Sequence, residues 1–214
     1  MLEFIGKRQK QGAAMTYVEF SSLVARQPDG VVLLEGRRAI LECDAVHAES
    51  LGRMLAARFP RLRFRTGNAL GADEAFSKGV VSVDATRLQV VLPYAGHRSG
   101  ARRPSVVYAS LDALPDSWEE KLAAKTIAAS GKYRSLIGYR NRSAAMAAKA
   151  AYLMRDTLKA VGWRGEFPRP ICACFYVDAH DPEAGGTGHT IRACRREGVP
   201  VVFQAAWRKW DGEG

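Results

Sequence analysis

Apolar residues recur along the chain in short runs that are separated by longer segments of mixed polarity. Five of these runs predict strands: VVLLE at 31–35, LRFRT at 62–66, LQVVLP at 88–93, ICACFYV at 171–177 and VPVVFQ at 199–204. Short runs that are apolar almost throughout are typical of parallel strands covered by helices on both faces. The pattern therefore predicts about five buried strands.

Between the predicted strands, apolar residues follow helical spacing. Residues 44–59 form one such segment, with Asp44 as the expected N-cap and Pro60 as the stop. The other expected helices are a short one through Phe76, one from Asp116 to Gly131 with a capping-box pair of Asp116 and Glu119, one from about Asn141 to Val161, and one that ends at Gly198.

Strands that alternate with helices indicate an α/β fold with right-handed crossovers. We expect a three-layer, doubly wound sheet, mainly parallel, with five strands in the order 3-2-1-4-5. That order places the carboxyl ends of the strands at 31–35 and 171–177 side by side, and ligands of such sheets bind in the crevice outside them. Residues 31–214 are predicted to form a single domain. Residues 1–30 are predicted to be an N-terminal extension, in which Met15 is an alternative start.

Composition narrows the class of protein. With 47% apolar and 25% charged residues the chain is an ordinary globular protein, which excludes disordered and fibrous classes. No apolar run approaches transmembrane length, and the first residues lack the apolar centre of a secretory signal, so we expect a cytoplasmic protein with no membrane partner. Cys172 and Cys174 are interpreted as core residues of a strand. A zinc site that adds His180 and His189 fits no standard spacing, so no metal or cofactor is predicted.

The charge of the chain bears on its partners. The formal net charge is +10, and such an excess raises the local concentration of phosphate ligands or polyanions. A well-solvated basic surface is the alternative interpretation.

The segment EAGGTGHT at 183–190 joins a predicted strand to a predicted helix. Glycines there permit positive φ and let a ligand approach the main chain, and the free amides of a helix's first turn favour phosphate. We predict a phosphate-binding loop, with a simple change of direction as the alternative. Its residues are Gly185, Gly186, Thr187, Gly188, His189 and Thr190. His189 could polarise a phosphate or act as an acid, or it could donate to nearby backbone.

Three other segments supply candidate ligand contacts. The glycines of RTGNALGADEAF at 65–76 allow a tight bend, its asparagine can hydrogen-bond a ribose or base, and its aspartate either caps the next helix or contacts the ligand. Arginines suit phosphate because the guanidinium is a planar fork. The basic loop HRSGARR is expected to close over a ligand. The contact candidates are Arg37, Gly67, Asn68, Gly71, Asp73, Arg140, Asn141 and Arg142, and the lid candidates are His97, Arg98, Arg102 and Arg103.

The chain resembles a Rossmann-like superfamily called SLOG over roughly residues 31–204. The resemblance lies in the order of four segments: RTGNALGADEAF, LQVVLPY, RNR and GGTGHTIRACRREGVPVVF. The superfamily includes the DNA-processing protein DprA (Smf) and the Lonely Guy phosphoribohydrolases. The resemblance implies a Rossmann-like fold with a pocket for a nucleotide or a nucleotide-derived ligand. It also implies a homodimer.

The two branches of the superfamily imply different functions. The RNR at 140–142 is similar to an Arg-Asn-Arg of DprA proteins, which implies single-stranded DNA as the partner. Lonely Guy enzymes cleave the N-glycosidic bond of nucleoside monophosphates with an arginine and with a glutamate that follows a Pro-Gly-Gly turn. Arg142 could fill the arginine's role, but Ala184 replaces the proline and Arg192 replaces the glutamate. A carboxylate from the preceding turn would have to substitute: Glu183, Asp178 or Asp181.

The leading hypothesis is that the chain binds a mononucleotide or an ADP-ribose-like ligand, for sensing or processing. The alternatives are a DprA-like single-stranded DNA-binding protein and a nucleoside-monophosphate phosphoribohydrolase with a displaced carboxylate. The catalytic candidates of the second alternative are Arg142, Glu183 and His189. Whether a reaction is catalysed stays open at this point.

Overall fold

The computed structural model describes residues 15–163, 165 and 167–210. Within this part of the chain the strands form one sheet in the order β4-β3-β2-β1-β5-β6, and every neighbouring pair is parallel. The strands are β1 (Val31–Gly36), β2 (Arg63–Thr66), β3 (Leu88–Leu92), β4 (Val107–Ser110), β5 (Cys172–Tyr176) and β6 (Val201–Phe203). The predicted α/β class and parallel sheet are confirmed.

The predicted count of five strands and the order 3-2-1-4-5 are wrong because of β4, which adds a sixth strand at the edge beside β3. All four residues of β4 are at least partly exposed, so this strand carries no buried apolar run by which the sequence could reveal it. The five predicted strands keep their expected neighbours. In particular, β1 pairs with β5, with Glu35 opposite Phe175. The carboxyl ends of these two strands therefore lie side by side, where the winding of the sheet reverses.

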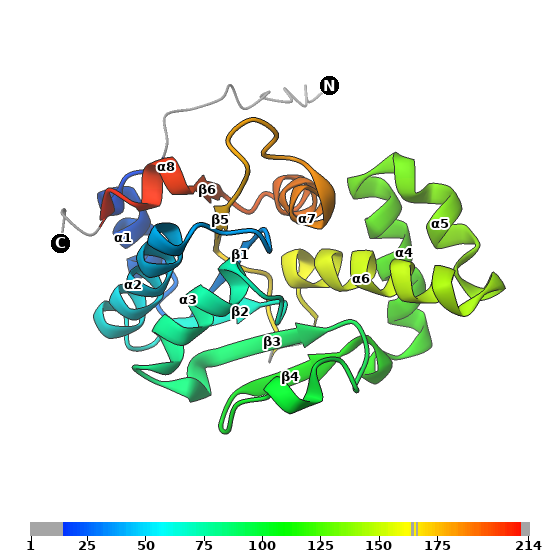
Figure 1. Cartoon of the computed structure of the whole chain (residues 1–214), viewed down its shortest axis with the longest axis horizontal. Helices are drawn as coiled ribbons and strands as arrows, with labels where there is room; N and C mark the ends of the chain where they lie inside the picture. The colour runs from blue at the N-terminus through cyan, green and yellow to red at the C-terminus, as the bar shows by residue number, and fades with distance from the viewer. Residues whose placement is uncertain (1–14, 164, 166, 211–214) are drawn as a thin grey trace, which may run out of the picture.

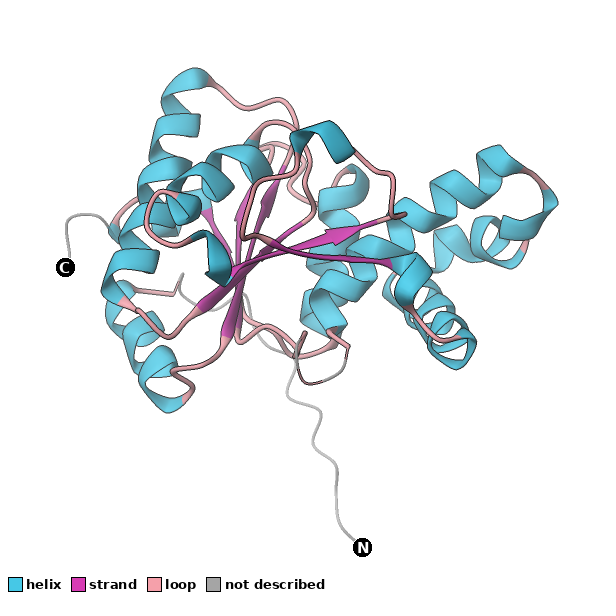
Figure 2. Ribbon diagram, turned by 90° about the horizontal axis from the view of Figure 1, so that it is seen from below, coloured by secondary structure: helices cyan, strands magenta, loops and turns pink. Residues whose placement is uncertain are grey.

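Helices cover both faces of the sheet and give three layers (Figures 1 and 2). One layer holds α1 (Tyr17–Arg26), α2 (Glu42–Arg58), α3 (Ala72–Val81) and α8 (Gln204–Trp207). The other holds α4 (Asp116–Ala129), α5 (Arg134–Gly138), α6 (Ala144–Val161) and α7 (Gly185–Arg196). In this second layer α6 and α7 lie against the sheet, whereas α4 and α5 project to the right in Figure 1. Short 3₁₀ helices are η1 (Ala85–Arg87), η2 (Ser99–Ala101), η3 (Leu111–Ala113), η4 (Gly131–Tyr133) and η5 (Arg140–Arg142).

Three predicted helix starts differ from the structure. Asp44 is not an N-cap: α2 begins two residues earlier, and the Asp44 carboxylate accepts a hydrogen bond from Tyr176 Oη at 2.7 Å. The capping box at Asp116 does not form, because α4 follows Pro115 without a side-chain cap. The helix expected from Asn141 begins at Ala144, since the Ser143 hydroxyl accepts a hydrogen bond from the amide of Met146 and thereby caps it.

The glycines of the 183–190 segment belong to the helix. α7 begins at Gly185, so Gly185 and Gly186 form its first turn and do not precede it. The helix ends as expected, with Gly198 at φ +72° just beyond its C-cap.

The helix α1 lies in the segment predicted as an N-terminal extension. Its Phe20 and Val24 are buried in the same apolar cluster as α2, α3 and α8. Residues 1–14 of that segment are outside the described part of the chain. None of the described helices is both long and apolar enough to span a bilayer.

Candidate ligand pocket at the carboxyl ends of β1 and β5

A pocket of about 580 Å³ opens at the carboxyl ends of β1 and β5. This volume lies within the range of about 300–1,000 Å³ that is usual for small-molecule sites. Its walls come from the loops after β1, β2 and β5, from α6 and from the start of α7. The lining residues that carry the following description are Glu35, Arg37, Arg38, Asp73, Lys149, Tyr152, Arg155, Asp156, Asp178, Asp181, Gly185, Gly186 and Thr187. We call this cavity the ligand pocket.

The first turn of α7 forms one wall of the ligand pocket. Gly185 adopts φ +59°, which glycine reaches without strain, and Gly185, Gly186 and Thr187 all line the cavity. The first amides of an α-helix have no partner within the helix, and the N-cap residue here, Ala184, provides no side-chain cap. These amides and the positive end of the helix dipole therefore favour an anion in the pocket.

Cationic side chains from two elements line the same pocket. Arg37, which was predicted as a contact, lines the pocket and forms an ion pair of 2.6 Å with Asp178. Arg38 from the same loop and Lys149 from α6 also line the pocket, and neither makes an ion pair with another described residue. Two cations that make no ion pair within the described part of the chain thus share the pocket with the first turn of α7.

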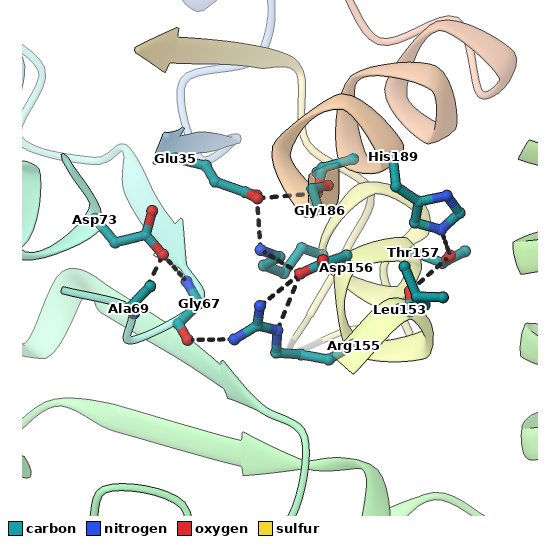
Figure 3. A network of polar contacts seen from close by, with 12 residues as sticks. Glu35, Gly67, Ala69, Asp73, Leu153, Arg155, Asp156, Thr157, Gly186 and His189 are labelled. Carbon is teal, nitrogen blue, oxygen red and sulfur yellow. Dashed lines mark hydrogen bonds and ion pairs between the residues drawn. The ribbon is translucent and has the colours of Figure 1, made fainter. Parts of the chain in front are cut away.

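The floor of the pocket is a network of buried charges (Figure 3). Lys159 Nζ forms ion pairs with Glu35 Oε2 at 2.7 Å and with Asp156 Oδ1 at 2.9 Å. Arg155 donates to Asp156 Oδ1 through Nη2 at 2.7 Å, and to the carbonyl oxygen of Gly67 through Nη1 at 2.8 Å. The Thr190 hydroxyl donates to Glu35 Oε1 at 2.9 Å. The network joins β1, α6, α7 and the loop after β2.

Burial shifts the protonation of this network. Loss of water raises the pKa of Glu35 to about 7, and although Lys159 opposes the shift, the nearby Asp156 adds to it. Burial acts in the same direction on Asp156, but Arg155 and Lys159 outweigh it and hold the pKa of that carboxyl below its ordinary value. Burial thus brings the pKa of Glu35 toward neutral pH, whereas the pKa of Asp156 stays low.

Asp73 ties the loops of the pocket together. Its carboxylate accepts hydrogen bonds from the amides of Gly36 at 3.0 Å, Gly67 at 3.2 Å and Ala69 at 3.3 Å. Asp73 was predicted as an N-cap or a ligand contact. It lies in the first turn of α3 behind the N-cap residue Gly71, and it lines the pocket.

Gly67 and Gly71 were predicted to allow a tight bend. Gly71 is at φ +82°, and a Cβ there would overlap the carbonyl group of Arg38, so glycine is required. A Cβ at Gly67 would lie 2.9 Å from Lys159 Nζ. Neither glycine is a wall of the ligand pocket; both let the loop after β2 pack closely against its surroundings.

Four predicted residues lie away from the pocket. Arg140 pairs with Glu119 and Glu120 at 3.1 and 2.6 Å. Asn141 and Arg142 are exposed, and the Arg142 guanidinium lies 3.9 Å from the centre of the Tyr139 ring. Glu183 forms ion pairs with Arg192 and Arg195 and is not a wall of the pocket.

The second turn of α7 is buried and packs against α6 and β1. His189 Nε2 is 2.9 Å from the Thr157 hydroxyl, and burial lowers the pKa of His189 to about 4, so the ring is neutral near pH 7 (Figure 3). A Cβ at Gly188 would overlap the carbonyl of Glu183. The part of the predicted loop that lines the pocket is thus Gly185–Thr187, whereas Gly188, His189 and Thr190 pack in the interior.

The predicted lid residues follow β3. His97 is buried, with its ring between those of Tyr94 and Tyr152. Arg98 donates to the carbonyl oxygen of Asn68 at 2.8 Å. Arg102 donates to the carbonyl oxygen of Ala95, and the amide of Arg103 donates to Tyr108 Oη at 2.8 Å.

Sequence reasoning missed Glu35, Arg155, Asp156 and Lys159. Glu35 stands at the end of an otherwise apolar strand run, and the other three lie at helical spacing in an alanine-rich helix. Charged residues inside segments that must be buried are the signal that could have revealed them. Among the described residues, no three His, Cys, Asp or Glu side chains are grouped so that they could hold a metal ion.

No protein-family model and no curated protein matches the chain. Among solved structures, the chain is similar to DNA processing protein A from Helicobacter pylori, whose structure is described as giving insights into its single-stranded DNA binding mode. The identity is 12%, the match covers 83% of this chain and 67% of the other, and the TM-score is 0.45. A likeness of this degree establishes neither a family nor a function.

Proposed function

We propose that the chain binds a nucleotide or a nucleotide-derived ligand in the ligand pocket, with a phosphate group at the start of α7. The observation that carries the proposal is the meeting of three anion-favouring features on one cavity. These are the first amides of α7, the cations Arg38 and Lys149, which form no ion pair with another described residue, and the position at the switch point of the sheet.

The acidic floor supports a sugar beside that phosphate. Glu35 of β1, Asp73 of α3 and Asp156 of α6 all line the cavity, and carboxylates accept hydrogen bonds from hydroxyl groups. A ligand with an anionic end and a hydroxyl-rich middle, such as a ribose phosphate, matches this division of charge.

Calorimetry with AMP and ADP-ribose tests the proposal, with Thr187→Glu as the decisive variant. A glutamate in the first turn of α7 is favourable for the helix, so the fold is retained, but its charge repels a phosphate in the pocket. We expect binding to weaken at least about a hundredfold, since like charges brought together cost several kcal/mol.

The matched control is Ser117→Glu, which places the same charge in the exposed first turn of α4. It should leave the affinity unchanged. The proposal is wrong if neither ligand binds, or if Thr187→Glu binds as well as the parent chain.

Single-stranded DNA is the second candidate, and one observation favours it. Tyr139 is 47% exposed on the projecting α4–α5 region, and Arg142 stacks on its ring. Exposed aromatic rings beside cations are platforms for bases of single strands. Together with the net charge of +10 this pair could bind a strand without using the ligand pocket.

Oligonucleotide binding distinguishes the two candidates. If DNA is the partner, affinity falls steeply with salt, Tyr139→Ala weakens binding at least about fivefold, and Thr187→Glu has no effect. The opposite pattern supports the ligand pocket.

A further inference from the structure

A second cavity, of about 170 Å³, lies beside the ligand pocket. Arg38, Ala69, Tyr152 and Arg155 line both cavities, so the two are direct neighbours. The remaining walls of the second cavity are Asn68, Leu70, His97 and Arg98. Its volume is far above the roughly 10–15 Å³ that one water requires, and it therefore has room for part of an organic ligand.

Two buried polar atoms of this cavity's walls have no hydrogen-bond partner among the described residues: Asn68 Nδ2 and His97 Nδ1. Buried polar groups are almost always paired, so unpaired ones on residues that line a cavity are candidate contacts for a ligand. The position of Asn68 is fixed. Its backbone is left-handed at φ +56°, which asparagine tolerates. Its main-chain carbonyl oxygen accepts a hydrogen bond from the Arg98 guanidinium.

Flat side chains line the same space. The ring of His97 is 5.7 Å from that of Tyr152, at an interplanar angle of 81°. Burial lowers the pKa of His97, and the nearby Arg155, Arg98 and Arg38 lower it further. The ring is therefore neutral near pH 7, with one nitrogen that donates and one that accepts. Neutral rings with a few polar atoms suit a planar heterocycle.

We propose that this second cavity, which we call the base pocket, holds the nucleobase of the ligand, with Asn68 Nδ2 donating to a ring nitrogen or carbonyl oxygen of the base. The inference rests on the proposed function, because the phosphate of the same ligand would lie at the start of α7. A base pocket implies that the preferred ligand is a nucleotide with an intact base and not a sugar phosphate that lacks one.

The experiment compares ribose 5-phosphate with AMP and CMP by calorimetry on the full chain. We expect at least one of the nucleotides to bind about tenfold more tightly than ribose 5-phosphate, which lacks a base to fill the base pocket. Asn68→Gly keeps the left-handed backbone conformation and removes the donor. It should weaken that nucleotide about tenfold, the effect of one lost hydrogen bond, and leave ribose 5-phosphate unchanged.

Asn141→Gly, at an exposed asparagine, is the matched control and should change neither affinity. His97→Phe keeps a flat ring without Nδ1, and a selective loss of nucleotide affinity in this variant supports the base pocket should Asn68→Gly fail to fold. The base pocket is overturned, and the proposed function stands, if ribose 5-phosphate binds as tightly as both nucleotides or if both variants weaken every ligand equally. If none of the three ligands binds, both proposals fall.

Discussion

The two faces of the sheet are built from different chemistry. On the face covered by α1, α2, α3 and α8, the strands contribute apolar side chains almost throughout, and Phe20, Phe76, Trp207 and Trp210 fill the space between them and the helices. On the face covered by α6 and α7, the strands contribute Glu35, Arg65 and Gln89 to the interior. Charged groups in a core add little net stability compared with apolar ones. The difference indicates that the first face provides most of the stability, whereas the second holds the candidate site.

Strand alternation produces this division. In β1, Val32 and Leu34 belong to the first face, whereas Leu33 and Glu35 face α6 and α7. In β2, the side chain of Arg65 donates to the carbonyl oxygen of Lys159 at 3.1 Å and to Gln89 Oε1 at 2.8 Å. Because side chains of a strand alternate, one polar residue per strand is enough to make a single face polar.

The largest effect is expected on the apolar face. Phe76→Ala should lower the free energy of unfolding by about 3–5 kcal/mol, because Phe76 is fully buried and its ring packs 5.6 Å from that of Trp207. Denaturant unfolding measures the loss, and it should be the same at pH 6 and pH 8. Val46→Ala, at an exposed position of α2, serves as the control. A loss below 1 kcal/mol for Phe76→Ala would contradict the role of this face in stability.

On the polar face, Lys159→Met should lower the free energy of unfolding by a similar amount, about 3–5 kcal/mol. The loss should depend on pH, unlike that of Phe76→Ala. The variant leaves Glu35 and Asp156 buried with Arg155 as their remaining cation. Glu35 can relieve this by taking up a proton, so the loss should grow as the pH rises above 7.

A double variant distinguishes the charge of Lys159 from its packing. Glu35→Gln combined with Lys159→Met removes one charge of each sign, and it should be more stable than Lys159→Met alone. Equal stability of the two variants at pH 8 would show that the lysine acts through packing and not through charge.

His189 predicts an acid-sensitive contribution from the polar face. Its pKa is about 4 in the folded chain and about 6.5 when exposed, so the stability it contributes is present above pH 6.5 and is lost as the pH falls to 4. The loss is up to about 3 kcal/mol. In His189→Gln this part of the pH dependence of unfolding should vanish, whereas His47→Gln, at an exposed position, should retain it.

The smallest effect concerns one hydroxyl. Thr190→Val keeps the shape of the side chain but removes the hydrogen bond to Glu35 Oε1, and it should cost about 1 kcal/mol. Thr190→Ser, which keeps the hydroxyl, should recover most of this loss in thermal unfolding. No difference between the two variants would mean that Glu35 does not need this donor.

The apolar face could largely be predicted from sequence, because its strands and helices follow simple periodicities. The site could be predicted only in part. The glycines at 185–186 indicated the N-terminus of α7 as part of the site, and Arg37 indicated the loop after β1. The expected partner Arg142 lies before α6, whereas Arg155 lies eleven residues beyond the start of that helix, about 16 Å along its axis. Nothing in the sequence shows which end of α6 reaches the sheet.

The carboxylate of Asp73 has a consequence for how the pocket responds to a ligand. This side chain accepts hydrogen bonds from three amides at the ends of β1 and β2. It therefore joins the loops after these two strands, so that they move as one unit. A cavity that is already assembled loses little conformational entropy on binding. Association should therefore be fast and nearly free of structural change on this side, and any slow step belongs to segments that Asp73 does not hold.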